Sequence, residues 1–115
     1  MKKILIIDDD PVNTHVLKWM LKSREYKVIS FASHKGIQDL LHQLSPDLLI
    51  MDISLDGANG CEICLGLKTG DSHSSLPILM TSANRDYYDT ECLADGFIPK
   101  PYDKLALLQA VEAII

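Results

Sequence analysis

Four short apolar segments constrain the fold of this chain, because each of them stops at a charged or hydroxyl side chain. Residues 4–7 precede Asp8, Asp9 and Asp10, residues 48–51 precede Asp52, residues 78–81 precede Ser82, and residues 97–99 precede Lys100. In an open parallel α/β sheet, ligands bind outside the carboxyl ends of the strands, close to the point where the strand order reverses. The pattern therefore predicts that carboxylates, a hydroxyl and an ammonium group meet at one edge of a sheet.

Apolar and amphipathic stretches alternate along the whole chain, which is typical of βαβ units and a parallel sheet. The expected strands are 3–8, 27–31, 47–52, 76–82 and 97–99, and the expected helices are 11–23, 35–44, 61–68, 86–94 and 104–115. Right-handed crossovers place such helices on both faces of the sheet. The 115 residues are enough for one α/β domain with a buried core, and we expect residues 1–115 to form it.

The charge balance argues against some classes of partner. A net charge of −5 argues against nucleic-acid binding by this chain, which would need a basic surface. No apolar run approaches the roughly 18 residues of a membrane span, and the apolar segment after Lys3 stops at three aspartates, too soon for a secretory signal. We therefore expect a cytoplasmic protein that binds neither membranes nor nucleic acid.

Several residues have a plain structural interpretation. Asp10 before Pro11 predicts a helix N-cap. Trp19 shares a helical stripe with Val12, Val16, Met20 and Ser23, so it is expected in the core.

The cysteines and histidines give no clear ligand pattern. Cys61 and Cys64 have the spacing of a redox or metal motif, but without a second pair they are expected to be buried structural cysteines, with Cys92 distant in sequence. No histidine has metal-ligand spacing with another, so surface positions are expected for His15, His34, His42 and His73.

Four motifs occur in order along the chain: Ile6-Ile7-Asp8-Asp9-Asp10, residues 47–52 ending at Asp52 with Gly60 eight residues later, Pro77-Ile-Leu-Met-Thr-Ser82-Ala83, and Phe97-Ile-Pro-Lys100-Pro101. With these motifs the chain resembles, over essentially its whole length, a receiver domain of a two-component response regulator. The resemblance implies a flavodoxin-like, doubly wound, three-layer α/β fold with strand order 2-1-3-4-5 and five helices. The chain departs from the family pattern at Asp56, where proline is usual, and at Leu93-Ala94, where Gly-Ala is frequent.

The resemblance also implies a function and a set of site residues. The domain would be a phosphorylation-activated switch, not an enzyme, which assists its own phosphorylation and dephosphorylation. Asp52 would accept a phosphoryl group from a histidine kinase or a histidine phosphotransfer protein, forming an aspartyl phosphate. Mg²⁺, with Mn²⁺ as an alternative, would bind Asp9 directly, Asp8 mainly through water, Asp52, and the backbone carbonyl of Ser54. Lys100 would neutralise charge on the transferred group.

Two further residues would form the switch. Ser82 would donate a hydrogen bond to the phosphoryl group, and Phe97 would turn into the space that this movement vacates. The bond between Lys100 and Pro101 is typically cis in the family. The surface of residues 86–94, 97–99 and 104–115 would change on phosphorylation and is a candidate homodimer face.

Physical chemistry supports the metal assignment, since a small hard cation prefers oxygen ligands. Without a cation, the carboxylates of Asp8, Asp9 and Asp52 would repel one another, and at least one of their pKa values should rise.

Two other interpretations stay open at the level of sequence. Asp8-Asp9-Asp10-Pro11-Val12 fits the Asp-x-Asp-x-Thr/Val motif of haloacid-dehalogenase-like phosphatases, in which Asp8 would be the nucleophile. No later acidic pair or cap segment accompanies it, and Asp52 has no role in that family. The second open interpretation is a degenerate receiver that only binds partners, although all five expected site residues are present.

Overall fold

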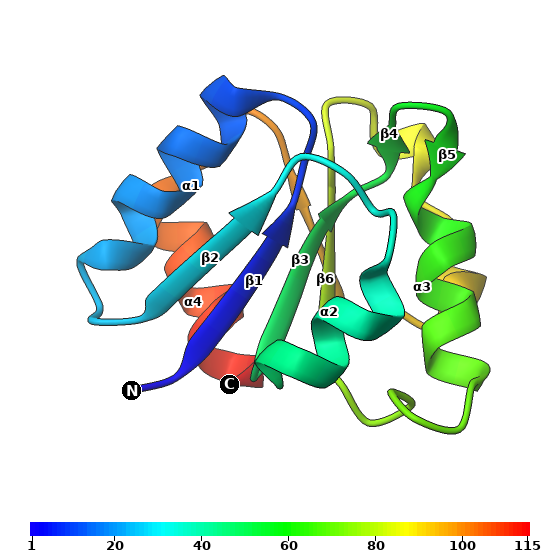
Figure 1. Ribbon diagram of the computed structural model, residues 1–115. Helices are drawn as coiled ribbons and strands as arrows, with labels where there is room; N and C mark the ends of the chain where they lie inside the picture. The colour runs from blue at the N-terminus through cyan, green and yellow to red at the C-terminus, as the bar shows by residue number, and fades with distance from the viewer.

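A five-stranded parallel sheet forms the centre of the molecule in the computed structural model, which describes residues 1–115 (Figure 1). Its strands are β1 (Lys3–Ile7), β2 (Lys27–Phe31), β3 (Leu48–Asp52), β6 (Ile78–Ser82) and β7 (Gly96–Pro99). The spatial order is β2-β1-β3-β6-β7, and every pair is parallel. Because β6 and β7 are the fourth and fifth strands of this sheet in chain order, the expected 2-1-3-4-5 topology is confirmed.

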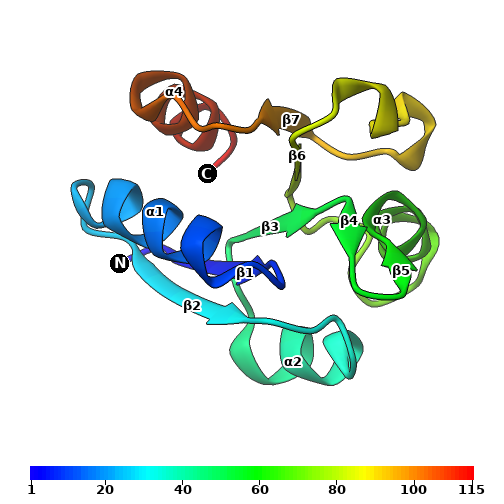
Figure 2. The same ribbon diagram turned by 90° about the horizontal axis from the view of Figure 1, so that it is seen from above.

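Two pairs of helices cover the sheet, and each pair packs on its own face (Figure 2). The helices are α1 (Pro11–Lys22), α2 (Ile37–Leu44), α3 (Gly60–Thr69) and α4 (Lys104–Ile114). Helices α1 and α4 bury one apolar cluster against the sheet, and α2 and α3 bury a second cluster on the other face. The five residues of β3 and the five of β6 are all buried, as expected for strands covered on both sides.

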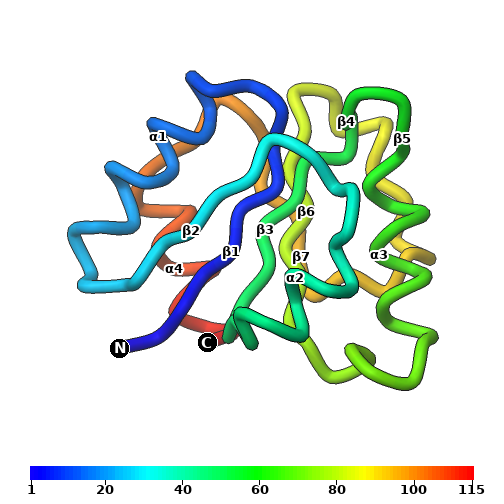
Figure 3. Tube along the Cα trace, viewed as in Figure 1, coloured from blue at the N-terminus to red at the C-terminus, as the bar shows by residue number.

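The two ends of the sheet differ in what they carry. Both chain termini lie at the end where the strands begin, while the first residues after β1, β3 and β6 lie at the opposite end (Figure 3). Alternation of strand and helix thus delivers the polar residues of four strand ends to one edge, as the sequence predicted.

A small antiparallel hairpin stands at that edge, where only a loop was expected. Strands β4 (Ser54–Leu55) and β5 (Ala58–Asn59) pair across an Asp56-Gly57 turn, with Gly57 at a φ of 72°. Asp-Gly between short extended segments is a recognised hairpin signal. Asp56, at the usual proline position of the family, is therefore an exposed turn residue.

The prediction of a fifth helix over residues 86–94 is wrong. The structure has two single 3₁₀ turns there, η1 (Arg85–Tyr87) and η2 (Thr90–Cys92), separated by extended residues. Asn84 and Asp89 each accept a hydrogen bond from the backbone two residues later, which starts each turn. Leu93 then adopts the left-handed conformation, with a φ of 67°. With only Cys92 buried, the segment has no apolar face to hold a continuous helix.

The prediction that Trp19 belongs to the core is also wrong. Its relative exposure is 63%, and the residues of α1 that are buried are Leu17, Met20 and Leu21. The helix is rotated so that Trp19 lies beside α4, where the Nζ atom of Lys104 stands 4.8 Å from its ring centroid. Its amphipathic indole remains largely in solvent.

Local expectations that the structure confirms include the helix cap at Asp10 and the buried cysteines. Asp10 caps α1 and Asp103 caps α4 by accepting backbone hydrogen bonds. Cys61, Cys64 and Cys92 are free and buried. None of the helices has the length and apolar character that crossing a bilayer requires.

Candidate functional site

Asp8, Asp52 and Lys100 meet at the carboxyl edge of the sheet, although they are far apart in sequence. The Nζ atom of Lys100 lies 2.7 Å from Oδ2 of Asp52 and 3.2 Å from Oδ2 of Asp8. Asp8 directly follows β1, Asp52 ends β3, and Lys100 follows β7. A single ammonium group therefore joins two carboxylates from adjacent strands.

The two carboxylates are buried and their other oxygens are also bonded. Asp8 is 3% exposed and Asp52 is 6% exposed. Oδ1 of Asp8 accepts a hydrogen bond from the backbone N–H of Asp10 at 2.9 Å, and Oδ1 of Asp52 accepts one from the N–H of Ser54 at 3.1 Å. These bonds to the following loops fix both carboxylates in orientation.

Burial and charge shift the ionisation of this cluster. Burial, more than the charge of Asp52, raises the pKa of Asp8 above its usual value, even though the Asp10 N–H and Lys100 act in the other direction. The expected rise of one carboxylate pKa is thus confirmed in direction, but its main cause is burial and not the expected repulsion between carboxylates. Burial alone would lower the pKa of Lys100, but its hydrogen bond with Asp52 and the charges of its neighbours raise it, so Lys100 stays cationic.

Asp9 completes an acidic cluster whose chemistry fits a divalent cation. One carboxylate oxygen from each of Asp8, Asp9 and Asp52 lies within 4.8 Å of the others, and Asp9 is exposed to solvent. The donors are all oxygens, which a hard cation such as Mg²⁺ prefers. The formal charges of three carboxylates and one ammonium sum to −2, which favours a cation at this place.

Ser82 lies beside this cluster at the end of β6. In the sheet, its neighbour Thr81 is paired with Asp52, and Ser82 itself is 3% exposed. Its Oγ accepts a hydrogen bond from the N–H of Asn84 at 3.0 Å, and its carbonyl accepts one from the N–H of Lys100 at 2.9 Å. The backbone thus ties Ser82 to Lys100, while its hydroxyl proton has no protein acceptor.

Phe97 lies in β7, the edge strand of the sheet, where it is paired with Met80 of β6, and its side chain is half-buried. Its ring stacks on Tyr88, with centroids 4.8 Å apart and planes 19° from parallel. Sequence reasoning did not single out Tyr88 as the partner of Phe97, because it assigned Tyr88 to a continuous helix. The peptide bond between Lys100 and Pro101 is cis.

Comparison with known protein families places these residues in context. The profile of the response regulator receiver domain family matches residues 4–112. Over 119 aligned residues the chain is 31% identical to the DNA-binding dual master transcriptional regulator RpaA of Synechocystis sp., which covers all of this chain and 49% of RpaA. It is 29% identical to the DNA-binding response regulator MtrA of Mycolicibacterium smegmatis, covering 97% of this chain and 50% of MtrA. The chain spans about half the length of these curated relatives.

Solved structures give the same result. A putative response regulator from Chloroflexus aurantiacus superposes with a TM-score of 0.90 and 27% identity, covering 98% of this chain and 96% of that one. The receiver domain of the sensor histidine kinase PA1611 from Pseudomonas aeruginosa, solved with a magnesium ion coordinated in its active-site cleft, gives 0.85 and 25%, with the same coverage. These findings support the receiver interpretation and not the haloacid-dehalogenase-like alternative. The chain belongs to the response regulator receiver domain family.

Proposed function

We propose that residues 1–115 form one receiver domain in which Asp52 accepts a phosphoryl group. The observation that carries this proposal is the position of Asp52, which is buried within a three-carboxylate cluster and lies 2.7 Å from the Lys100 ammonium. An acyl phosphate formed there adds negative charge, which the cation of Lys100 stabilises. The charge balance of the site thus suits a carboxylate that acts as nucleophile.

A magnesium ion, with Mn²⁺ as an alternative, would be held by Asp8, Asp9, Asp52 and the backbone carbonyl of Ser54. The oxygen-only donor set and its net negative charge support this assignment. When bound, the ion supplies positive charge to the phosphoryl oxygens during transfer.

The phosphoryl donor is the phosphohistidine of a histidine kinase or of a histidine phosphotransfer protein. An oxygen of Asp52 attacks phosphorus, the O–P bond forms as the N–P bond breaks, and the electron pair of the N–P bond returns to the donor imidazole. The ammonium group of Lys100 already donates a hydrogen bond to Asp52, so a small movement would bring it to the phosphoryl oxygens, where the negative charge then lies.

The switch begins at Ser82, whose hydroxyl proton is free to bond a phosphoryl oxygen. Turning toward Asp52 breaks the bond from Asn84 to Ser82 Oγ and draws the following loop inward. That loop leads into η1 and Tyr88, so its movement disturbs the stack of Tyr88 on Phe97. The face of η1, η2, β7 and α4 would then change shape, and we propose it as the output and homodimer face.

We propose that this is a cytoplasmic regulatory domain and not an enzyme, because the phosphoryl group is transferred to its own Asp52 and not to a separate substrate. Its negative charge argues that nucleic acid is not bound by this domain itself.

The test is phosphorylation by a small donor. Acetyl phosphate with Mg²⁺ should add one phosphoryl group to the wild type, and peptide mapping should locate it on Asp52. Asp52→Asn should abolish incorporation, while Asp103→Asn, an exposed cap on α4, is the matched control and should be phosphorylated normally. Modification on Asp8, or incorporation that survives Asp52→Asn, would reject the proposal.

Oligomeric state tests the output face separately. Sedimentation of the phosphorylated and unphosphorylated chain should show dimers only after phosphorylation. A phosphorylated chain that stays monomeric would reject the homodimer and leave the phosphoacceptor assignment intact.

A further inference from the structure

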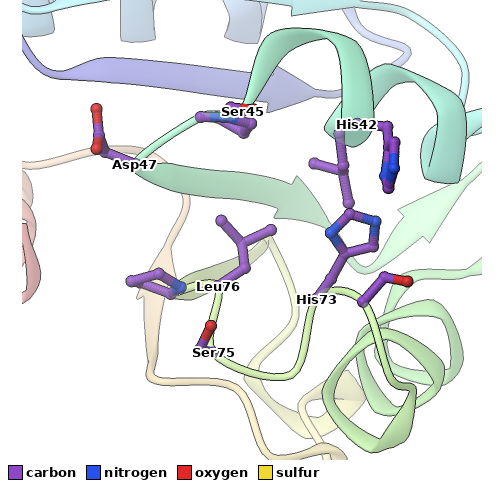
Figure 4. A pocket seen from close by; sticks show the side chains of 10 residues that line it. His42, Ser45, Asp47, His73, Ser75 and Leu76 are labelled. Carbon is purple, nitrogen blue, oxygen red and sulfur yellow. The ribbon is translucent and has the colours of Figure 1, made fainter.

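A polar cavity of about 500 Å³ opens at the end of the sheet where the strands begin, away from the acidic cluster (Figure 4). One wall comes from the end of α2 and the turn into β3, and the other comes from the loop between α3 and β6. The cavity therefore brings two segments together that are about thirty residues apart in sequence, and each contributes a histidine, His42 and His73.

The two histidine side chains face one another in this cavity. The rings of His42 and His73 point toward each other, and their centroids are 6.0 Å apart with planes at 88° (Figure 4). The Nε2 atom of His73 is buried and has no hydrogen-bond partner. Buried polar atoms are normally satisfied, so this nitrogen, which has no protein partner, is available to bind a ligand. The sequence predicted surface positions for both histidines, and in the structure His42 is exposed while His73 is half-buried.

Both histidines are held by ordered backbone. His42 lies in the last turn of α2, which ends where the N–H of Ser45 donates to the carbonyl of Leu41. The carbonyl of His73 accepts a hydrogen bond from the N–H of Leu76, which closes a turn before β6. The two imidazoles are therefore presented from fixed positions, and only their side-chain torsions need to adjust.

We propose that His42 and His73 bind a divalent transition-metal ion of the zinc type, one imidazole nitrogen from each side chain. Imidazole favours Zn²⁺, Ni²⁺ and Cu²⁺ over the hard ions that carboxylate oxygens select. With a Zn–N bond of about 2.1 Å and tetrahedral geometry, two imidazoles on one ion have centroids about 5 Å apart. The observed 6.0 Å is close to that value, so small side-chain rotations bring both nitrogens to the ion.

Water completes the coordination, because no third protein ligand stands beside the pair. Asp47 also lines the cavity, but its carboxylate accepts a hydrogen bond from the N–H of Lys3 at 2.8 Å and lies at the other end of the opening (Figure 4). A site with two protein ligands binds more weakly than a structural four-ligand site. The bound ion joins the end of α2 to the loop before β6 and stabilises the folded chain by mass action.

The direct test is NMR of the histidine side chains during titration of the full chain with Zn²⁺. Excess Mg²⁺ is present throughout to compete at the acidic cluster. The imidazole nitrogen signals of His42 and His73 should shift together at submillimolar Zn²⁺, while those of His15 and His34 should not. This measurement needs no variant, so it does not depend on whether a substitution is tolerated.

Variants then assign the ligands. Loss of even an outer partner of a metal ligand costs about 10- to 100-fold in affinity, so His42→Gln and His73→Gln should each weaken Zn²⁺ binding at least about tenfold by calorimetry. His15→Gln and His34→Gln are the matched controls and should bind as the wild type does. Unchanged affinity in His42→Gln and His73→Gln, shifts confined to the cysteines or other histidines, or no response at submillimolar Zn²⁺ would each overturn the proposal. None of these measurements involves Asp52 phosphorylation, so their failure is separate from failure of the proposed function.

Discussion

A methyl group added at Gly60 tests how closely the first turn of α3 approaches the end of β3. An added Cβ would overlap the carbonyl oxygen of Asp52 and would lie 2.9 Å from both the Cα of Ile53 and the Cε of Met80. The N–H of Gly60 also donates to the carbonyl of Ile53 at 2.7 Å. Two of the three contacts are backbone atoms, so a rotamer change cannot relieve them.

The magnitude follows from two opposing terms. Forcing extra volume into a packed core costs typically about 1–3 kcal/mol. Replacing glycine by alanine in a helix returns at most about 1 kcal/mol. Since β3 is buried and paired on both sides, it cannot move away cheaply. We therefore take the overpacking cost at the upper end of its range, about 3 kcal/mol. After the gain of about 1 kcal/mol from helix propensity, Gly60→Ala should lower the free energy of unfolding by about 2 kcal/mol.

Gly66, in the same helix, is the matched control. It is exposed, and an added Cβ there meets no atom within 4 Å. Gly66→Ala should therefore raise the free energy of unfolding by about 0.5–1 kcal/mol through helix propensity alone. Urea unfolding of both variants measures the difference.

The Gly60 clash also predicts a change at the site. Because the displaced oxygen belongs to Asp52, Gly60→Ala should slow acetyl-phosphate labelling of Asp52 and Gly66→Ala should not. If Gly60→Ala is as stable as the wild type, or if both variants shift stability in the same direction, the argument from close packing is refuted.

Three further predictions concern the acidic cluster and α1. Folding raises the pKa of Asp8, so the protonated carboxyl favours the folded state at low pH, and this contribution to stability is lost as the pH rises through the folded pKa. Asp8→Asn should therefore be more stable than the wild type at neutral pH without divalent ions. Urea unfolding at acidic and neutral pH should show this difference in stability only at the higher pH. Mg²⁺ at about 100 times its Kd should stabilise the wild type by about 2.7 kcal/mol in thermal or urea unfolding. This effect should be largely lost in Asp9→Asn. Equal gains in both proteins would argue against the acidic cluster as the binding site. Trp19→Ala should change the free energy of unfolding by no more than about 0.5 kcal/mol. Leu17→Ala, at a buried position of the same helix, should lower it by about 2–5 kcal/mol. Comparable losses in the two variants would show that Trp19 belongs to the core.

The parts of the fold that sequence predicted well are those that rest on strong local patterns. Strands β3 and β6 are continuous apolar runs buried on both faces, and they lie where periodicity placed them. The meeting of Asp8, Asp52 and Lys100 followed from topology alone, because parallel strands share one carboxyl edge.

The predictions that failed depended on small energy differences or on long-range contacts. Helix α1 has apolar side chains around much of its circumference, so packing against α4 and the sheet decides which of them are buried. Trp19 lies outside the buried stripe. The pairing of His42 with His73 depends on how the loop after α3 folds back against α2, which no local pattern records. The hairpin at Asp56-Gly57 did have a local signal, and it was available in the sequence.

The weak sequence signal in residues 83–95 and the proposed switching role of this segment have the same physical origin. Only Cys92 is buried there, and each 3₁₀ turn depends on one side-chain cap rather than on an apolar face. A segment with so few buried contacts can be rearranged at little free-energy cost. It follows Ser82 directly and places Tyr88 on Phe97, so under the proposed mechanism the loss of one hydrogen bond at Ser82 would bias its conformation. A strongly specified helix at this position would have been easier to predict and harder for a single phosphoryl group to move.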